Sequence, residues 1–485
     1  MQALGQRFTF LFRSTKGLIL VAIAMIGIAT AFFGLLSGPM AELGIRDIWV
    51  RLFGVQMVPA EREGRIVMLY HSIAMAVVAI ETYIITAIIK MKEQYKTMIN
   101  ATITVGFMCA MIFGLLFAYF GHNWIFHGLF LFGQSLIFFA GCILAVALNP
   151  WAKEYRVGKS EYASWRGIDL ERAAFFAMAI AMLGSALFGA VPASYSGNGF
   201  ETFLAEDVVR EVEKNPLELA VIGHLHIMLT LIAVALALIV GRWFDFKGGW
   251  HKVAMPLMML GTIIITLGVW LVVPFEETAH YIIYAGSVGI LLAALFLVIF
   301  GFRKLIAEGT RDNPKAGFVQ KIGALLRDPL KFGSLWQMVY MNFAVTFIGL
   351  FMAIRLDAII RTWPHREERI TLTGHWHMLA TIIATIILLY YGDMIGLKGR
   401  VRQLFGWFII IFSDLALGAA AVFATKRLYV AESEQQSLVN GIMIVTDFSL
   451  AAILVVLALL MIWRLVDLFK AKGMWKKELE EEALR

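Results

Sequence analysis

The chain alternates between long apolar runs and short polar segments. Twelve runs extend for about 20 residues each, the length that an α-helix needs to cross roughly 30 Å of hydrocarbon. Such runs are too long and too uniformly apolar for the strands of a membrane barrel. The pattern therefore predicts an all-α integral membrane protein, a single membrane domain over 1–485 with twelve transmembrane helices, at residues 17–37, 67–89, 98–120, 125–148, 173–191, 219–241, 253–274, 280–301, 336–356, 372–391, 404–424 and 441–463.

Composition and charge agree with this pattern. Hydrophobic residues make up 60% of the 485 residues and charged residues only 16%, which excludes an ordinary soluble domain and a disordered chain. With the N-terminus in the cytoplasm, the inner segments hold 30 of the 42 Lys and Arg residues, as the positive-inside rule requires. We therefore expect a multi-pass protein of the cell (inner) membrane with both termini cytoplasmic. The net charge of +7 follows from this topology and needs no nucleic-acid partner.

Three histidines recur at a nearly constant interval. His226 lies 155 residues after His71, and His377 lies 151 residues after His226. Each begins an apolar run that is followed by a short basic segment. A fixed period indicates an internal repeat, so we predict three pseudo-symmetric groups of four helices, at about 17–148, 173–301 and 336–463. Twelve-helix transporters more often consist of two related halves.

Two near-identical motifs carry the candidate chemistry. Each is a glycine followed by His-x-His: His224 with His226, and His375 with His377. Residues at i and i+2 on a helix point about 200° apart, so the two histidines of a motif serve different centres. Ionisable residues inside a membrane are costly and usually functional, and histidine commonly holds haem iron. These four histidines and His71 favour a layer of ligands over plain hydrogen bonding.

At this point the sequence resembles the catalytic subunit of the heme-copper oxidase superfamily, including its nitric oxide reductase branch. That family has twelve helices in three groups of four, with histidines on the second, sixth and tenth. The resemblance implies that His71 and His377 hold a low-spin haem and that His375 is the proximal ligand of a second haem. A histidine of the sixth helix, His224 or His226, would face that second haem, where the family has copper or a non-haem iron.

The chain departs from that family at the second metal. The His-His pair expected after the seventh helix is missing, since residues 271–280 read LVVPFEETAH. The family's tyrosine after the sixth-helix histidine is also missing, and the sixth helix has an additional histidine. We therefore expect a closed bis-histidine second haem, formed by His375 with His224 or His226. The alternative is an atypical metal site that His280 and Glu277 help to form, since non-haem iron takes carboxylate and imidazole ligands.

Several charged residues add weaker candidates. Five basic residues on the predicted outer side run against the positive-inside trend and would pair with haem propionates: Arg361, Arg366, Arg369, Lys426 and Arg427. Glu81 falls near mid-membrane, where a charge is expensive, and is a candidate proton or quinol site. Asp414 and Asp447 also fall within predicted helices. We expect His122, His127 and His365 at the outer surface and His251 at the inner one, as solvated side chains. The acidic outer segment 201–218 would dock a cytochrome or another basic partner.

These observations predict a membrane-embedded electron-transfer or oxidoreductase subunit with two haem b groups, and a copper or non-haem iron in the atypical case. Neither Cys109 nor Cys142 lies in a Cys-x-x-Cys-His motif, which covalent haem attachment requires, so we expect both to be free thiols. Electrons would pass between quinol or an external cytochrome and a partner subunit or terminal acceptor. Two alternatives stay open: an active oxygen or nitric oxide reductase, and a non-redox transporter whose histidines couple to protons.

Overall fold

The computed structural model describes residues 12, 17–37, 44–55, 62–121, 123–158, 161–195, 216–313, 315–355, 359, 362–363 and 365–470. Within them the chain forms helices joined by turns, plus one two-stranded hairpin of β1 (Ser164–Trp165) and β2 (Ile168–Asp169). Eleven of the described helices are long and apolar enough to cross a membrane. The prediction of a multi-pass, all-α membrane protein is confirmed at this level.

The helices extend beyond the predicted apolar windows because their ends continue into polar residues. Their bounds are α2 (Leu18–Ser37), α3 (Ile45–Phe53), α4 (Arg62–Ile88), α5 (Glu93–Phe120), α6 (Trp124–Leu148), α7 (Leu170–Tyr195), α8 (Pro216–Trp243), α9 (Gly249–Gly309), α10 (Phe318–Leu325), α11 (Pro329–Val339), a π-helical turn (Tyr340–Val345), α12 (Thr346–Arg355), α13 (His365–Met394), α14 (Gly399–Thr425) and α15 (Glu432–Lys470). Two short 3-10 turns (Lys153–Tyr155 and Lys426–Leu428) complete the helical elements described.

Helix α9 is bent back on itself. Its 61 residues would reach about 90 Å if straight, three times the thickness of the hydrocarbon layer. The helix is broken at Phe275 (φ −146°, ψ 57°), directly after Pro274. Glycines let the two limbs approach closely: a Cβ built on Gly261 would lie 3.0 Å from Cγ1 of Ile290, and a Cβ on Gly268 would lie 2.9 Å from Cγ1 of Ile283. The limbs therefore pack antiparallel from the turn at Phe275.

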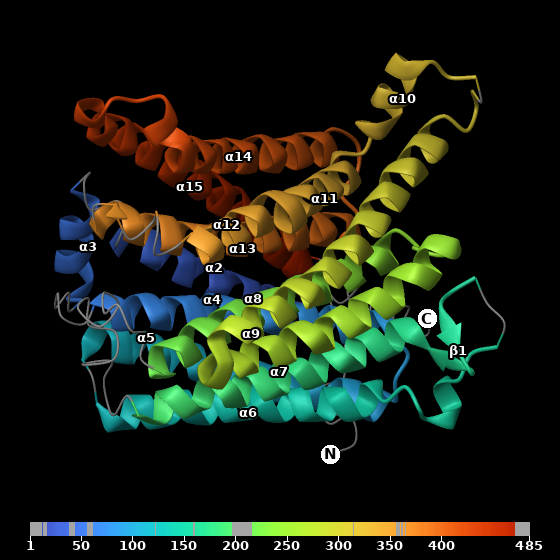
Figure 1. Ribbon diagram of the computed structural model, residues 1–485, viewed down its shortest axis with the longest axis horizontal. Helices are drawn as coiled ribbons and strands as arrows, with labels where there is room; N and C mark the ends of the chain where they lie inside the picture. The colour runs from blue at the N-terminus through green and yellow to red at the C-terminus, as the bar shows by residue number, and fades with distance from the viewer. Residues whose placement is uncertain are drawn as a thin grey trace. The chain divides into compact units, whose positions relative to one another are not determined.

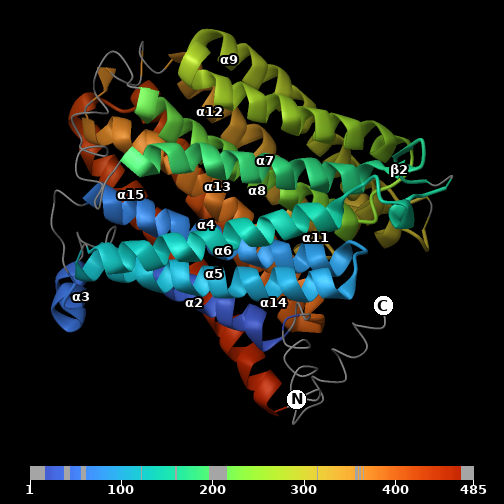
Figure 2. The ribbon, with the colours of Figure 1, turned by 90° about the horizontal axis from the view of Figure 1, so that it is seen from below.

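The chain divides into two compact units. Unit 1 comprises residues 1–239, 247–293 and 458–485, and unit 2 comprises 240–246 and 294–457. In unit 1, α4 packs against α2 and α5, α5 against α6, and α6 against α7, so that these long helices run side by side (Figures 1 and 2). In unit 2, α11 packs against α13 and α14, and α13 against α14.

Arg172 joins three segments at one end of unit 1. Its guanidinium donates to the carbonyl oxygens of Lys90 (2.7 Å), Asn149 (3.4 Å) and Ala147. The last carbonyls of a helix have no partner within the helix and carry partial negative charge, so a cation shared between the ends of α4 and α6 stabilises both. The Tyr155 ring lies 3.6 Å from the guanidinium carbon. Burial and then the neighbouring Glu154 raise the pKa of the Tyr155 phenol.

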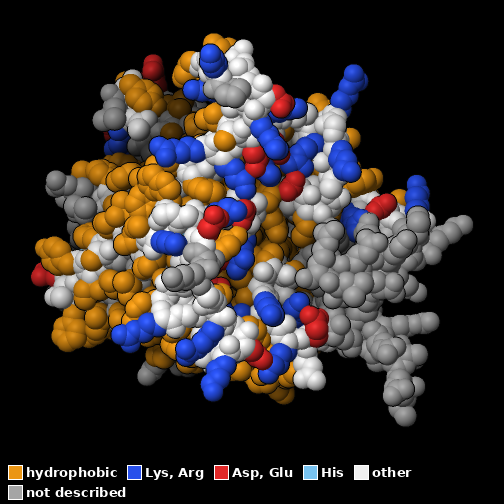
Figure 3. Space-filling model, turned by 90° about the vertical axis from the view of Figure 1, so that its right-hand side faces the viewer, with side chains coloured by type: hydrophobic (Ala, Val, Ile, Leu, Met, Phe, Trp, Pro, Cys, Tyr) orange, Lys and Arg blue, Asp and Glu red, His pale blue; other side chains and the backbone are white. Residues whose placement is uncertain are grey.

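Arg402 has the corresponding role in unit 2. Its guanidinium forms ion pairs with Asp328 (2.7 Å) and Asp393 (2.6 Å), and the Trp243 indole donates to Asp393 over 2.6 Å. These contacts join the end of α13 to the beginnings of α11 and α14. Figure 3 shows Lys and Arg side chains, with fewer Asp and Glu, beside hydrophobic side chains.

Candidate histidine site

Two of the predicted ligands lie side by side inside unit 1. His71 lies on α4 and His224 on α8, with ring centroids 6.2 Å apart and ring planes 16° apart. A metal–imidazole bond is about 2.0–2.1 Å long, and the ring nitrogen is about 1 Å from the ring centre, so one metal ion between two coaxial imidazoles would separate their centroids by about 6 Å. The observed spacing matches that geometry.

A backbone carbonyl fixes the orientation of the His224 ring. Nδ1 of His224 lies 2.8 Å from the carbonyl oxygen of Ser185 on α7. A carbonyl only accepts, so Nδ1 carries the proton and Nε2 keeps its lone pair. Histidines that bind metals almost always donate their other ring nitrogen in this way. The Nε2 atom of His224 is therefore left as a free acceptor, the form in which an imidazole can bind a metal.

Glycines bring the neighbouring helices against this ring. A Cβ built on Gly189 of α7 would overlap the His224 imidazole. On α8, a Cβ on Gly223 would lie 3.2 Å from Val269 and 3.3 Å from Phe188. The glycine that precedes the first His-x-His motif is thus a packing residue, a role that the sequence pattern alone did not assign.

His226 points away from this pair, as the helical period requires. Its side chain is exposed, and its Nδ1 lies 2.8 Å from the carbonyl oxygen of Ile222 on the same helix. The two histidines of this motif therefore lie in different surroundings, one inside unit 1 and one on its surface.

His375 lies in unit 2 and is only 6% exposed. A Cβ built on Gly349 of α12 would lie 2.9 Å from both Cε1 and Nε2 of His375, but 4.0 Å from Nδ1. The Nε2 edge of the ring therefore rests on the α12 backbone. In this orientation, ligation of a metal through Nε2 would require the ring to turn.

The remaining predicted residues are less fully described. The side chains of His377, Arg366 and Arg369, and all of Arg361, lie outside the described part of the structure. Lys426 is fully buried, with its ammonium 4.1 Å from the Phe423 ring centroid, and the Arg427 guanidinium lies 4.9 Å from the Trp363 ring centroid. Both cations contact aromatic faces at the end of α14, so their pairing with propionates stays a prediction.

The end of the first α9 limb does not form a metal cluster with other described residues. Glu277 is exposed, and His280 stacks on Tyr284 with a centroid distance of 6.4 Å. Among the residues that the structure describes, no group of three or more His, Cys, Asp or Glu side chains is close enough to hold a metal ion. The atypical metal site stays a prediction.

Glu81 is buried within unit 1. It lies on α4 ten residues after His71 and is 2% exposed, and its Oε1 has no hydrogen-bond partner among the described residues. A buried carboxylate without a partner costs far more free energy than a neutral carboxylic acid. The structure therefore favours a protonated Glu81.

A buried polar network near Glu81 was not predicted from the sequence. The Tyr83 hydroxyl lies 2.8 Å from Oγ1 of Thr104, Thr86 donates to Asn100 over 3.1 Å, and the Asn100 amide donates to the Phe12 carbonyl over 2.7 Å. The available signal was the spacing of Asn100 and Thr104, which puts two polar residues on one face of an apolar helix.

Other sequence-based placements have mixed outcomes. The solvated role expected for His251 is wrong: it is 1% exposed, and its Nδ1 accepts a hydrogen bond from the Ala163 amide over 2.8 Å. His365, expected at the outer surface, is the first residue of α13, and its side chain lies outside the described part of the structure. Asp414 accepts from the Trp336 indole at 3.1 Å, and both cysteines are free thiols. His122 and residues 201–215 lie outside the described residues.

Comparison of the chain with protein-family models, curated proteins and solved structures found no match.

Proposed function

We propose that this protein is a membrane-embedded electron-transfer subunit in which His71 and His224 hold the iron of a haem b. The observation that carries the proposal is the pair of nearly parallel imidazoles, with ring centroids 6.2 Å apart and Nδ1 of His224 fixed by the Ser185 carbonyl. If both histidines held the iron, it would have no position left for an exogenous ligand, which would suit electron transfer better than gas binding. When bound, the haem supplies a one-electron redox centre.

The residues around the pair bind and orient the ligands. The Ser185 carbonyl holds the His224 ring, and Gly189 leaves space for that ring. The hydrogen bond from Nδ1 also makes Nε2 more basic and so strengthens its bond to a metal. His71 begins the apolar span of α4, and His224 lies near the start of the apolar span of α8.

The helix count supports the resemblance to heme-copper oxidases. Eleven spans are described, and counting the two limbs of α9 separately gives twelve. We propose that these twelve form three pseudo-symmetric groups of four. The protein would lie in the cell (inner) membrane with both termini in the cytoplasm.

The proposal differs from the family in the partner of His71. The resemblance pairs His71 with His377, whereas His224 is the histidine that lies beside His71 within unit 1. The wider proposal retains a second haem, held by His375 or His377. It also retains a quinol or cytochrome as electron donor, and a second metal. Glu81 is its candidate proton or quinol residue.

Haem spectra of single-histidine variants test this proposal. We expect the purified wild-type chain to show a Soret band and b-type bands on reduction. His71→Ala and His224→Ala should each remove the same low-spin haem. His226→Ala, on the same helix but exposed, is the matched control and should retain it. Loss of that haem in His377→Ala but not in His224→Ala would restore the family's pairing.

Carbon monoxide distinguishes electron transfer from gas reduction. A haem with imidazoles on both sides should bind carbon monoxide slowly and incompletely after reduction. Rapid stoichiometric binding, together with copper or non-haem iron in the metal analysis, would overturn the closed site and support an oxygen or nitric oxide reductase.

A proton-coupled transporter is the second candidate, because Glu81 is buried and its Oε1 is unpartnered. A wild-type chain without any haem absorption would remove the first proposal and leave this one. In that case proteoliposomes should take up protons with a substrate, and Glu81→Gln should abolish the coupling.

A further inference from the structure

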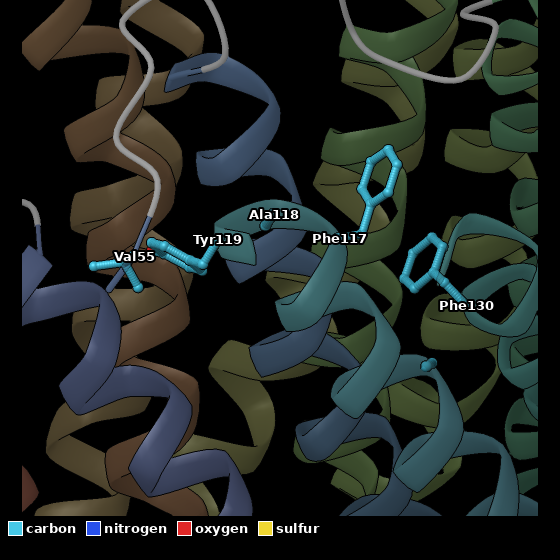
Figure 4. Close-up of a cluster of buried hydrophobic side chains, with 6 residues drawn as sticks. Val55, Phe117, Ala118, Tyr119 and Phe130 are labelled. Carbon is cyan, nitrogen blue, oxygen red and sulfur yellow. The ribbon is translucent and has the colours of Figure 1, made fainter. Parts of the chain in front are cut away.

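Helix α3 lies at the end of the long helices of unit 1 and runs across them (Figure 1). It packs against α2. Two contacts fix its level. The Phe53 ring of α3 lies 6.4 Å from the Phe33 ring, and Phe33 belongs to the last turn of the span that ends at Leu36. Val55, just after α3, packs with Tyr119 at the end of α5 (Figure 4).

Both neighbouring spans therefore end at the level of α3. The α2 span ends at Leu36 and the α5 span at Phe120. The hydrocarbon layer ends where its spanning helices end, so α3 lies in the boundary between acyl chains and headgroups. This placement follows from contacts within unit 1 alone.

The side chains of α3 divide into three sectors. Val50 packs against the cluster that contains Tyr119, and Phe53, although 46% exposed, contacts the Phe33 ring. Ile48 and Leu52, one turn apart, are 67% and 70% exposed. Asp47 and Arg51, also one turn apart, are exposed as well and point about 100° away from Ile48 and Leu52.

This division fits a helix that lies flat in a membrane interface. Such a helix turns an apolar sector toward the acyl chains and a charged sector toward water. A helix standing in water would leave Ile48 and Leu52 hydrated at a cost, because burying each such side chain is worth roughly 1.5–3 kcal/mol. The charged sector beside them argues against a protein partner covering the whole exposed surface, since charged residues are depleted at interface cores.

We propose that α3 is an interfacial helix that binds the bilayer surface, with Ile48 and Leu52 in the acyl-chain boundary and Asp47 and Arg51 in the hydrated headgroup layer. Its partner is the lipid bilayer itself. The helix then fixes the depth of α2 and α5 relative to the membrane.

Spin-label accessibility tests this inference in the full chain. Cys109→Ser and Cys142→Ser provide a cysteine-free background, and Ile48→Cys, Leu52→Cys or Asp47→Cys then carries the label in lipid nanodiscs. At 48 and 52 we expect frequent collisions with oxygen, which concentrates in lipid, and few with a water-soluble nickel chelate. The matched control at 47 should show the reverse. Equal nickel accessibility at all three positions would overturn the proposal.

Protection of positions 48 and 52 from both reagents would also overturn it, because a second copy or another protein would then cover the face. A measurement on the wild-type chain guards against misfolded variants. A lipid with a photoactivatable group near its headgroup should label the peptide containing residues 45–53. Absence of labelling there, with labelling of the spanning helices retained, would contradict the inference.

Discussion

His224 and His375 follow equivalent glycines in the same short motif, yet their surroundings differ. In unit 1, the His224 ring is held by the Ser185 carbonyl and lies beside another imidazole. In unit 2, the Nε2 edge of His375 rests on the backbone at Gly349. The glycine before each motif differs as well: Gly223 is tightly packed, and Gly374 has no neighbour within 4 Å of a built Cβ. The motif supplies an imidazole in both units, but the packing of the adjacent helix determines which groups that imidazole contacts.

The largest effect is expected from Gly189→Ala. The added methyl group would overlap the His224 ring, and overpacking of this kind costs about 1–3 kcal/mol. The ring would lose its hydrogen bond to the Ser185 carbonyl. Both the haem content of the His71–His224 site and the free energy of unfolding should therefore fall. Unfolding in mixed micelles and haem-to-protein ratios check both. Gly128→Ala, where the Cβ meets nothing within 4 Å, is the control, and equal behaviour of the two variants would contradict the prediction.

Gly349→Ala should have a smaller effect, at about 1 kcal/mol of stability. The methyl group would lie 2.9 Å from the His375 ring edge, and the ring can turn away. Because the proposed haem ligands lie in unit 1, its low-spin spectrum should not change. A loss of that spectrum in Gly349→Ala would instead indicate that His375 is a haem ligand of the same site.

The pair Gly223→Ala and Gly374→Ala tests the difference between the two motifs directly. Alanine is better than glycine within a helix by about 0.5–1 kcal/mol. At position 374 nothing opposes that gain, so the variant should unfold at a higher denaturant concentration than wild type. At 223 the contacts of 3.2–3.3 Å should cancel the gain or reverse it. Equal shifts in the two unfolding midpoints would show that the packing difference does not affect the free energy of unfolding.

Ser185→Ala should have the smallest effect. The Oγ of Ser185 is buried without a hydrogen-bond partner among the described residues, and His224 uses the backbone carbonyl, which alanine keeps. Removing an unsatisfied hydroxyl should leave stability unchanged or raise it by up to about 1 kcal/mol. The haem spectrum should match that of wild type, and a shifted spectrum would show that the hydroxyl acts on the site.

The hydrophobic pattern predicted the helices well because each span must be apolar over a fixed length. The windows 253–274 and 280–301 correspond to the two limbs of α9, although their close packing through Gly261 and Gly268 has no local signal. The approach of His71 to His224 was not predicted, since it depends on how α4 and α8 pack, which a one-dimensional period does not encode. Helix α3 was missed because its apolar residues are too few to form a spanning run. His251 was placed wrongly because nearness to a loop says little about burial.

The turn of α9 bears on how the protein is made. Between its limbs the chain reverses at Phe275 without a connecting loop, and only a few polar side chains, Glu276 and Glu277 among them, need to pass through the bilayer. No long soluble segment separates the two limbs, so little polar chain would have to cross the bilayer between the insertion of one limb and the other. The two limbs are therefore suited to entering the membrane together, as one hairpin, rather than as two successive insertions.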